Sequence, residues 1–403
     1  MLSELAAGAA RAGERVETGG RVAFRGDGQL VIEHGGVRLS VVAATPGFDV
    51  GAQPGAWVTV LGTYDGERLH AQSVRVDTAA APDFGRASSE ALWGQRGVAM
   101  LQQRDVLQQT VRAFFASRGF TEVETPVVVR NPGLELQLDA LEVHGLPGSD
   151  PPRYLHTSPE YHMKRLLGAG LPRLYQLCPA HRRGELGPLH EPAFTMLEWY
   201  RAFADSGELM ADTERLVADA ARALCGATRV TTAFGEVELA PPWERLTVAD
   251  AFTRYAGVDM ATLLPDEEAY YRVLVERVEP QLGRGRPTLL THYPASMAAL
   301  ARLHDDDPRF ADRFEAYVCG VELCNGFGEL TDAAEQRRRF EAELSARARA
   351  GRACPPIDER FLGALADGLP PCAGNALGFD RLLMLLLGER RIADVMAFAQ
   401  ERA

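Results

Sequence analysis

The sequence predicts an α+β protein in which a small OB-like β-barrel precedes a larger domain, built on a mostly antiparallel sheet flanked by helices. The 403 residues are 46% hydrophobic, which is enough for one large core and a small satellite domain. Short alternating runs fill the first part of the chain, and strand-like and helix-like segments then interleave without a βαβ rhythm. We therefore assign residues 1–80 to the barrel, 81–96 to a linker and 97–403 to the larger domain.

Five runs that alternate apolar and polar residues predict the strands of the barrel. They are RVAFR, QLVIEH, VRLSVVA, AWVTVLGTY and RLHAQSVRV, and the turn sequences GDG, HGG, PGFDVGAQPG and DGE separate them. Five short strands of this kind are typical of an OB-like barrel. The segment is slightly acidic and poor in aromatic residues, which favours a scaffold or protein-docking module over oligonucleotide binding. The Ala/Ser/Pro-rich stretch DTAAAPDFGRASSEAL then indicates a linker.

The composition limits the partners and the compartment. A net charge of −12 and a sequence pI near 5.3 provide no overall positive field for polyanions, which disfavours tRNA as a partner. Six scattered cysteines without a CxxC pair predict reduced thiols in a cytosol and no structural zinc. The first residues lack a signal peptide's apolar region, and no run of ~20 apolar residues follows. We expect a cytoplasmic protein that makes no membrane contact.

The larger domain begins with clear helix and strand signals. MLQQRDVLQQTVRAFFASRGF has apolar residues at helical spacing and stops at Gly119. TEVETPVVV predicts a strand interrupted by Pro126, and GELMADTERLVADAARALCG predicts a helix that ends at Gly226. Lys164 is the only lysine among 43 basic residues. An arginine-favouring genome explains this bias, but a lysine kept against it also hints that an ammonium is needed there.

The first candidate site is the stretch YQLCPAHRRGELGPLHEPAFTMLEWYRAF, residues 175–203, which predicts a hairpin whose loop can fold over a ligand. Arg182, in the loop, could pair with phosphate oxygens, and Phe194 could stack on adenine. Glu198 and Tyr200 share one face of the returning strand and together could recognise an amine. An exposed charged hairpin with a buried Phe and Trp is the alternative. Glu185 and His190 also lie in or near the loop.

The second candidate is RFEAYVCGVELCNGFGELTD, residues 313–332. Glu315, Glu322 and Glu329 recur every seven residues, with Asn325 between the last two. A helix presenting acids to solvent has the same spacing. However, Gly320, the Asn325–Gly326 pair and the β-rich run AYVCGVEL favour strands joined by a turn. Carboxylates on such a sheet could hold Mg²⁺ or pair with a substrate ammonium.

The third candidate is GNALGFDRLLMLLLG, residues 374–388. A glycine-bounded strand leads through Gly378 into an apolar helix with Arg381 in its first turn. Small residues let a nucleotide approach the backbone, and the arginine can meet a phosphate there. A buried amphipathic helix explains this pattern equally well.

Together these segments resemble the three signature motifs of class II aminoacyl-tRNA synthetases. VETP resembles motif 1, the RRGE to MLEWY hairpin resembles motif 2, and GFDR resembles motif 3. HTSPEYHMKRLL, FTMLEWY, ELCNGFGELTD and ADVMAFAQERA are similar to the lysyl branch and, more closely, to its truncated paralogues, the elongation factor P lysine ligases. The resemblance runs from about residue 97 to the end, and motif 1 also implies a homodimer.

The resemblance implies a role for each matching residue. Arg182 and Arg381 would contact ATP phosphates as the catalytic residues, Phe194 would stack on adenine, and Glu315 and Glu322 would hold Mg²⁺. The ATP site would comprise Arg182, Arg183, Gly184, Glu185, His190, Glu191, Phe194, Glu322, Leu323, Gly378 and Arg381. The amino-acid pocket would comprise Ser158, Pro159, Glu160, Glu198, Tyr200, Asn325, Glu329 and Ala376, and Lys164 falls within the SPEYHMKR signature.

Four positions distinguish this chain from its two groups of relatives. Ala376 matches the ligases, whereas lysyl-tRNA synthetases usually carry glycine, and one methyl can discriminate substrates by ~1–3 kcal/mol. His181 stands where the ligases usually have Phe, and Glu191 and Ala193 depart from the ligase pattern because the chain reads HEPAF where the ligases read HNPEF. A carboxylate at 191 weakens phosphate binding unless Mg²⁺ or Arg183 offsets its charge. The N-terminal barrel is also additional to the ligase pattern.

These features predict an ATP-dependent enzyme that activates lysine or (R)-β-lysine as an adenylate and transfers it to a lysine side chain of elongation factor P. Two alternatives stay open. The chain could be a lysyl-tRNA synthetase with a reduced anticodon domain, which the acidic barrel and Ala376 disfavour. It could also be a catalytically silent paralogue that binds lysine or ATP, although both arginines and all three glutamates are present.

Overall fold

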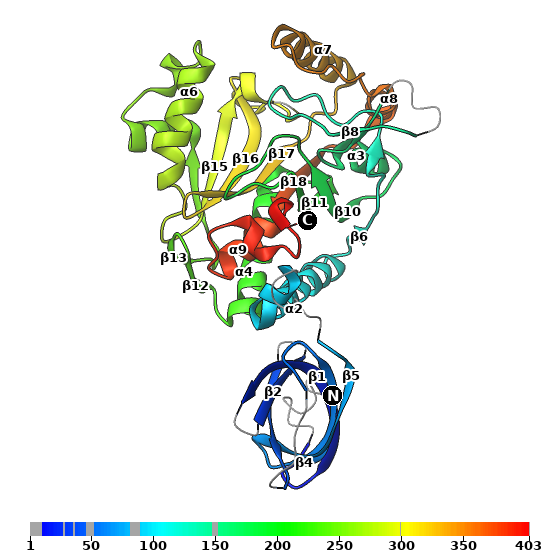
Figure 1. Ribbon diagram of the computed structural model, residues 1–403. Coiled ribbons are helices and arrows are strands. Elements are labelled where there is room, and N and C mark those ends of the chain that lie inside the picture. The colour runs from blue at the N-terminus through cyan, green and yellow to red at the C-terminus, as the bar shows by residue number, and fades with distance from the viewer. Residues whose placement is uncertain are drawn as a thin grey trace. The chain divides into compact units, whose positions relative to one another are not determined.

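The computed structural model describes residues 10–26, 29–34, 37–45, 52–80, 89–146, 152–298 and 300–402 (Figure 1). The chain folds into two compact units, with the boundary between Gln103 and Arg104. Among the described residues, no helix is both long and apolar enough to cross a membrane. The GDG and HGG turns and the long PGFDVGAQPG loop of the barrel lie partly outside the described residues.

The N-terminal unit is a closed barrel of five strands, and this confirms the predicted OB-like fold. The strand order is β1-β2-β3-β5-β4, and β3 and β5 pair in parallel whereas the other pairs are antiparallel. The strands are β1 Arg15–Gly26, β2 Gln29–His34, β3 Val37–Ala43, β4 Trp57–Tyr64 and β5 Arg68–Thr78. Alternate apolar side chains fill the interior because successive residues of a strand point to opposite faces.

A bulge beside Gly62 allows the barrel to close. The register between β4 and β5 shifts between Leu61 and Gly62. A Cβ atom at Gly62 would collide with the backbone carbonyl group of His70, so only glycine permits this close approach of the two strands.

The larger unit is organised around an eight-stranded sheet with the order β14-β15-β16-β17-β18-β11-β10-β6. Only the outer pairs β14–β15 and β10–β6 are parallel, which confirms the predicted, mostly antiparallel sheet. Its strands are β6 Thr121–Glu122, β10 Arg173–His181, β11 Ala193–Ala202, β14 Glu244–Thr247, β15 Thr288–Pro294, β16 Phe310–Val318, β17 Val321–Gly328 and β18 Cys372–Gly378. One small sheet contains β7 Val128–Val129, β8 Glu142–Val143 and β9 Arg153–Leu155. A second small sheet contains β12 Arg229–Thr232 and β13 Gly235–Glu238.

Helices flank this sheet (Figure 1). They are α2 Ser89–Ala116, α3 Glu160–Gly168, α4 Ser206–Cys225, α5 Val248–Ala251, α6 Glu267–Val273, α7 Ala333–Arg349, α8 Glu359–Gly368 and α9 Phe379–Leu386. Short 3₁₀ or π turns cover Phe252–Ala256, Met260–Thr262, Leu274–Val278, Glu279–Gln281, Ala295–Met297, Ile392–Val395 and Gln400–Arg402.

The helix α2 begins at Ser89, so residues 89–96 are helical rather than part of a linker. The linker prediction for residues 81–96 rests on the Ala/Ser/Pro-rich composition of this part of the chain. However, Ala91, Leu92, Gln95 and Arg96 are strong helix formers, and they continue the helix predicted after them.

The helix α4 covers the face of the sheet opposite the candidate site residues. It contacts β16, β17 and β18, and the amide of Asn375 on β18 donates a hydrogen bond to Thr213 Oγ1 of α4 at 2.8 Å. Asp205 and Glu208 form a capping box at its start, and Gly226 ends it with φ +75°. The predicted end at Gly226 is therefore confirmed.

Replacing Asp205 with alanine should lower the free energy of unfolding of the larger unit by about 1 kcal/mol, because the backbone N–H of Glu208 loses its acceptor at 3.0 Å. Chemical denaturation followed by circular dichroism measures the change. Asp219→Ala is the control, since Asp219 lies on the same helix in an exposed pair with Arg222 that contributes about 0–1 kcal/mol. Equal destabilisation by both variants would contradict the capping role.

Candidate active site

The central strands place the candidate residues on one face of the sheet. Opposite residues of antiparallel neighbours share a face, and Glu198 of β11 pairs with Ala376 of β18, which in turn pairs with Asn325 of β17. Tyr200 likewise pairs with Gly374, and Met196 pairs with Gly378. The three candidate stretches, residues 175–203, 313–332 and 374–388, therefore meet on one surface, although they are far apart in the chain.

A cavity of about 250 Å³ opens on this surface at the start of β11. Motif 2, the start of β17 and the turn from β18 into α9 supply its walls. Its lining includes ten of the predicted residues, Arg182, Glu185, His190, Glu191, Phe194, Glu322, Leu323, Ala376, Gly378 and Arg381. Arg183 and Gly184 lie in the loop but do not line the cavity. A site with an aromatic ring, two arginines and a glycine-bounded strand end suits a nucleotide.

Arg381 is held in the cavity wall by three neighbours. Its guanidinium donates to the backbone oxygen of Leu189 at 3.2 Å and to the backbone oxygen of Glu322 at 2.9 Å. It also lies 3.2 Å from the Glu322 carboxylate. Its Nη2 lies 2.8 Å from His190 Nε2, and burial together with the Arg381 charge lowers the pKa of His190. A neutral imidazole can accept this hydrogen bond, so the guanidinium is fixed in place before a phosphate arrives.

Arg182 and Phe194 face each other across the motif 2 hairpin. The guanidinium carbon lies 5.2 Å from the centre of the Phe194 ring, and Glu185 Oε1 lies 3.8 Å from Arg182 Nη1. Because the arginine covers the ring in this arrangement, a purine that stacks on Phe194 must take the position of the guanidinium or insert beside it. The motif 2 hairpin thus provides both a stacking surface and a cation.

The unusual Glu191 is tied to the C-terminal segment. The side chain is buried, and its Oε2 accepts a hydrogen bond from the backbone N–H of Gln400 at 2.9 Å. Ala193, the other change in HEPAF, is exposed at the start of β11. The hydrogen bond therefore gives the Glu191 carboxylate a structural partner in the C-terminal segment.

A second group of polar residues lies deeper on the same face, beyond Ala376. Glu198 is buried and accepts hydrogen bonds from Tyr200 Oη at 2.5 Å and Ser158 Oγ at 2.9 Å. Lys164 Nζ lies 2.5 Å from both Glu160 Oε1 and Glu329 Oε2. We call Glu160, Lys164, Glu198 and Glu329 the carboxylate cluster. Pro159 is the N-cap residue of α3 and places Ser158 and Glu160 at the cluster.

Burial and mutual repulsion shape the charge of this cluster. Burial and the Glu160 charge raise the pKa of Glu198 to about 7. Burial also raises the pKa of Glu329 to about 8, despite the lowering effect of Lys164. The cluster holds three carboxylates and only one ammonium, which Glu160 and Glu329 share, so an additional cation would be bound favourably here. The cluster is therefore chemically suited to a substrate that carries an ammonium group.

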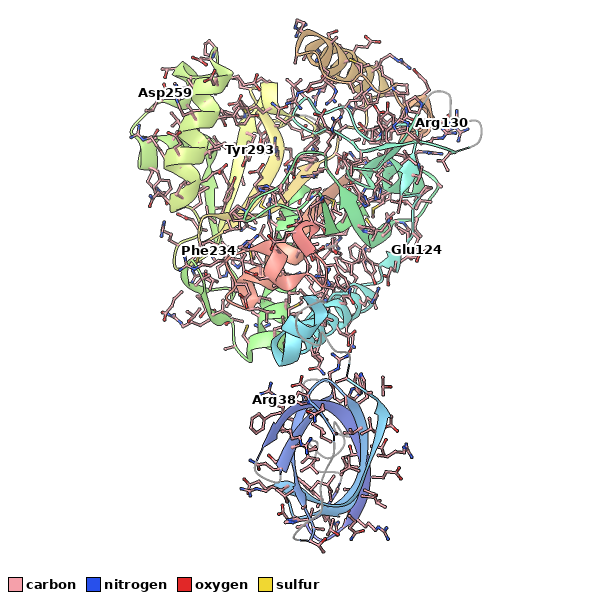
Figure 2. The ribbon with its side chains drawn as sticks, in the orientation of Figure 1. Arg38, Glu124, Arg130, Phe234, Asp259 and Tyr293 are labelled. Carbon is pink, nitrogen blue, oxygen red and sulfur yellow. The ribbon has the colours of Figure 1, made fainter. Side chains whose placement is uncertain are left out.

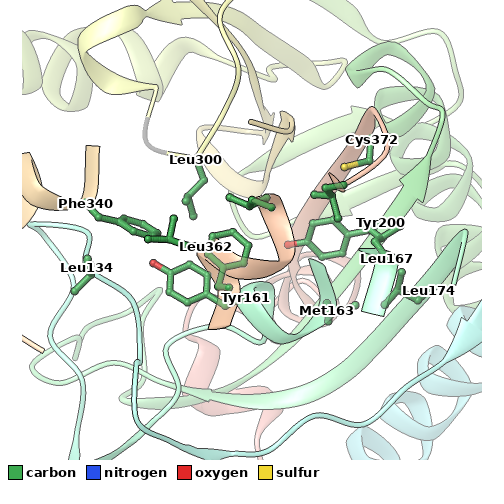
Figure 3. Close-up of a cluster of buried hydrophobic side chains, with 13 residues drawn as sticks. Leu134, Tyr161, Met163, Leu167, Leu174, Tyr200, Leu300, Phe340, Leu362 and Cys372 are labelled. Carbon is green, nitrogen blue, oxygen red and sulfur yellow. The ribbon is translucent and has the colours of Figure 1, made fainter. Parts of the chain in front are cut away.

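Gly374 is required for the packing beside the cluster. A Cβ atom there would collide with the Tyr200 ring and would lie 2.5 Å from Glu329 Oε1. Figure 3 shows Tyr200 among the buried side chains, with Leu167, Leu174 and Cys372 nearby. The apolar core therefore holds the Tyr200 ring, while its hydroxyl reaches Glu198.

The two predicted Mg²⁺ ligands differ in their surroundings. Glu322 lines the cavity, but Glu315 is buried and bound by its own neighbours. Its Oε2 accepts hydrogen bonds from Tyr293 at 2.6 Å and Tyr317 at 2.7 Å, and its Oε1 lies 2.5 Å from Arg313 Nη2. Figure 2 labels Tyr293 on β15. Glu322 thus fits a cation at the phosphates, whereas Glu315 must first exchange these partners.

Several residues of the site were missed by the sequence analysis. Burial, followed by the charges of Glu315 and Glu322, raises the pKa of Glu279 to about 7, which adds a third acid to this region. Arg313 also donates to Asn325 Oδ1 at 3.2 Å. Arg104 of α2 pairs with the buried Asp380 at 2.5 Å, and Asp380 accepts from the Thr195 backbone at 2.6 Å. Nothing in the sequence distinguishes Arg104 from the other arginines.

The antiparallel sheet carries a cavity lined by two arginines and a phenylalanine beside the carboxylate cluster, and this arrangement suits an enzyme that activates an amine-bearing substrate with a nucleotide. Residues 92–402 match the family described as tRNA synthetases class II (D, K and N). The chain belongs to this family, and its class is that of an ATP-dependent ligase.

The similar proteins include two named elongation factor P–(R)-β-lysine ligase. The one from Sodalis glossinidius is 42% identical over an alignment of 330 residues that covers 76% of this chain and 96% of that protein. The one from Salmonella paratyphi B is 40% identical over an alignment of 327 residues that covers 75% of this chain and 95% of that protein. The family match begins after the N-terminal barrel.

Proposed function

We propose that this enzyme activates (R)-β-lysine or lysine with ATP and transfers the aminoacyl group to a lysine side chain of elongation factor P. The carboxylate cluster carries the proposal, because it lies beside the nucleotide cavity, with Ala376 between the two. A lysine-like substrate bound there could place its ammonium at the cluster and its carboxylate toward the cavity. The similar ligases support elongation factor P as the acceptor.

The chemistry requires positioning and charge stabilisation rather than a protein nucleophile. A carboxylate oxygen of the amino acid attacks the α-phosphorus of ATP, the bond to the bridging oxygen breaks, and pyrophosphate leaves. Arg182 and Arg381 would hold the phosphates and stabilise the charge that develops on them. An acceptor ε-amine then attacks the carbonyl carbon, an amide forms and AMP leaves. Mg²⁺ held by Glu322 would offset phosphate charge.

Two further features belong to the same proposal. The VETP segment resembles motif 1, which supports a homodimer, and the scattered free cysteines support a cytoplasmic location. The net charge of −12 supports a protein acceptor over tRNA.

Amino-acid-dependent ATP–pyrophosphate exchange tests the first step. We expect exchange with (R)-β-lysine or α-lysine and none with leucine, followed by transfer to purified elongation factor P. Lysine tRNA is the competing acceptor in a parallel reaction. Transfer to tRNA alone would indicate a lysyl-tRNA synthetase, and absence of exchange with both amino acids would indicate a silent paralogue.

The KM for the amino acid should rise as the pH falls from about 8 to 6. Below the raised pKa values of Glu198, about 7, and Glu329, about 8, these carboxyl groups gain protons and lose their attraction for an ammonium. Above these values both are charged, so binding is strongest there. Exchange kinetics at several pH values measure the effect, with the KM for ATP as the internal control. A constant amino-acid KM from pH 6 to 8.5 would contradict the assignment of the cluster.

A further inference from the structure

Lys164 provides the positive charge of the carboxylate cluster from within the protein. It is the only lysine of the chain, and its side chain is fully buried on α3. The ammonium lies 2.5 Å from both Glu160 and Glu329, and 5.9 Å from the centre of the Phe361 ring. Glu160 is four residues earlier on the same helix, whereas Glu329 follows β17, so Lys164 joins two separate parts of the fold.

The three carboxylates are stabilised in two different ways. Glu198 receives hydrogen bonds from the neutral hydroxyl groups of Ser158 and Tyr200. Glu160 and Glu329 instead share the Lys164 ammonium. Neutral donors orient Glu198 without neutralising it, and this leaves its negative charge for a ligand. Without Lys164, three carboxylates would share one region, and the pKa values of Glu198 and Glu329, which the Lys164 charge lowers, would rise further.

We propose that Lys164 is a positioning residue for the amino acid, acting as an internal counter-ion that fixes the side chains of Glu160 and Glu329 around the substrate ammonium. This inference rests on the proposed function of the cluster as an amino-acid pocket. Lys164 itself does not bind the substrate in this arrangement, because its ammonium is already shared between two carboxylates.

Other charged or titratable groups also act on the cluster, and they define its electrostatic surroundings. Arg302 is paired with Asp312 at 2.9 Å and therefore does not replace Lys164 as the direct partner of the cluster. The titratable groups that interact with members of the cluster from the surrounding elements include Glu135, Tyr161, Cys178, Tyr200 and Cys372.

The single lysine makes a direct test possible in the wild-type protein. Labelling with ¹³Cε-lysine should give one lysine resonance in an NMR spectrum of the full chain. We expect this resonance to shift when (R)-β-lysine or α-lysine is added, using whichever supports exchange, and to stay in place when leucine is added. An unchanged resonance at a saturating concentration of the active amino acid would overturn the proposal.

Lys164→Met provides the second test, with Arg165→Met as the matched control on the same helix. The KM for the amino acid should rise about tenfold in Lys164→Met, as expected for a lost charge-assisted interaction, and its pH dependence should move to higher pH. The KM for ATP should stay unchanged, and Lys164→Arg should restore part of the affinity. Equal losses for ATP and amino acid without a pH shift would instead indicate a purely structural role.

The outcomes separate this inference from the proposed function. Exchange by the wild-type enzyme tests the activation step of the proposed function, and that result does not depend on the role of Lys164. If Lys164→Met does not fold, the labelled wild-type protein decides the question alone.

Discussion

Arg381→Ala should reduce amino-acid-dependent ATP–pyrophosphate exchange by about 100- to 1,000-fold. The guanidinium is fixed by Leu189, Glu322 and His190 before the nucleotide binds, so it meets the developing phosphate charge without reorganisation. Removing one such preorganised donor typically costs about that factor in kcat. The loss should appear in kcat more than in the KM for ATP, because the interaction strengthens as charge develops.

The control for this variant is Arg337→Ala. Arg337 lies on α7 and forms an exposed pair with Glu359 at 2.5 Å, so its loss should leave exchange close to the wild-type rate. Circular dichroism would show that both variants are folded. Near-wild-type exchange by a folded Arg381→Ala protein would refute the role assigned to this arginine.

Glu198→Gln should raise the KM for the amino acid by roughly 10- to 100-fold, which is the effect of losing a charged hydrogen-bond partner worth about 1.5–3 kcal/mol. The glutamine keeps the shape of the side chain and one oxygen that can accept from Ser158 or Tyr200. The change therefore removes charge rather than volume. The KM for ATP should change little, because Glu198 does not line the nucleotide cavity.

Exchange kinetics with varied amino acid and fixed ATP measure this effect, and Glu359→Gln is a matched control at an exposed position. The Glu198→Gln variant should also lose the contribution that Glu198 makes to the pH dependence below about pH 7. Unchanged amino-acid affinity would show that the substrate ammonium is bound elsewhere.

Local sequence patterns predicted a large part of the fold and the nucleotide cavity. The motif 2 hairpin, the turn after β16 and the change from strand to helix at Gly378 depend on residues that are close in the chain. Of the two turn signals in this stretch, Gly320 forms the turn together with Cys319, both with positive φ, whereas Asn325 and Gly326 lie within β17. Strand pairing overrode the turn preference of the Asn–Gly pair.

The partners of individual charges could not be predicted in the same way. Glu315 is a predicted metal ligand, and in the structure Tyr293 on the neighbouring strand and Arg313 on its own strand contact its oxygens. Glu191 accepts a hydrogen bond from the backbone of Gln400, near the end of the chain. Neither contact leaves a periodic or compositional signal, because each depends on which distant segments pack together.

The sequence by itself determined the two-part organisation, the class of sheet and the residues that could bind a nucleotide, since hydrophobic periodicity, turn residues and motif spacing act over short stretches of chain. Only the tertiary structure decided how the charges are shared. It set Lys164 between Glu160 and Glu329 and left Glu198 with neutral donors. The physical reason is that the charge of a buried carboxylate depends on its solvation and its nearest partners, and the packing of distant segments sets both.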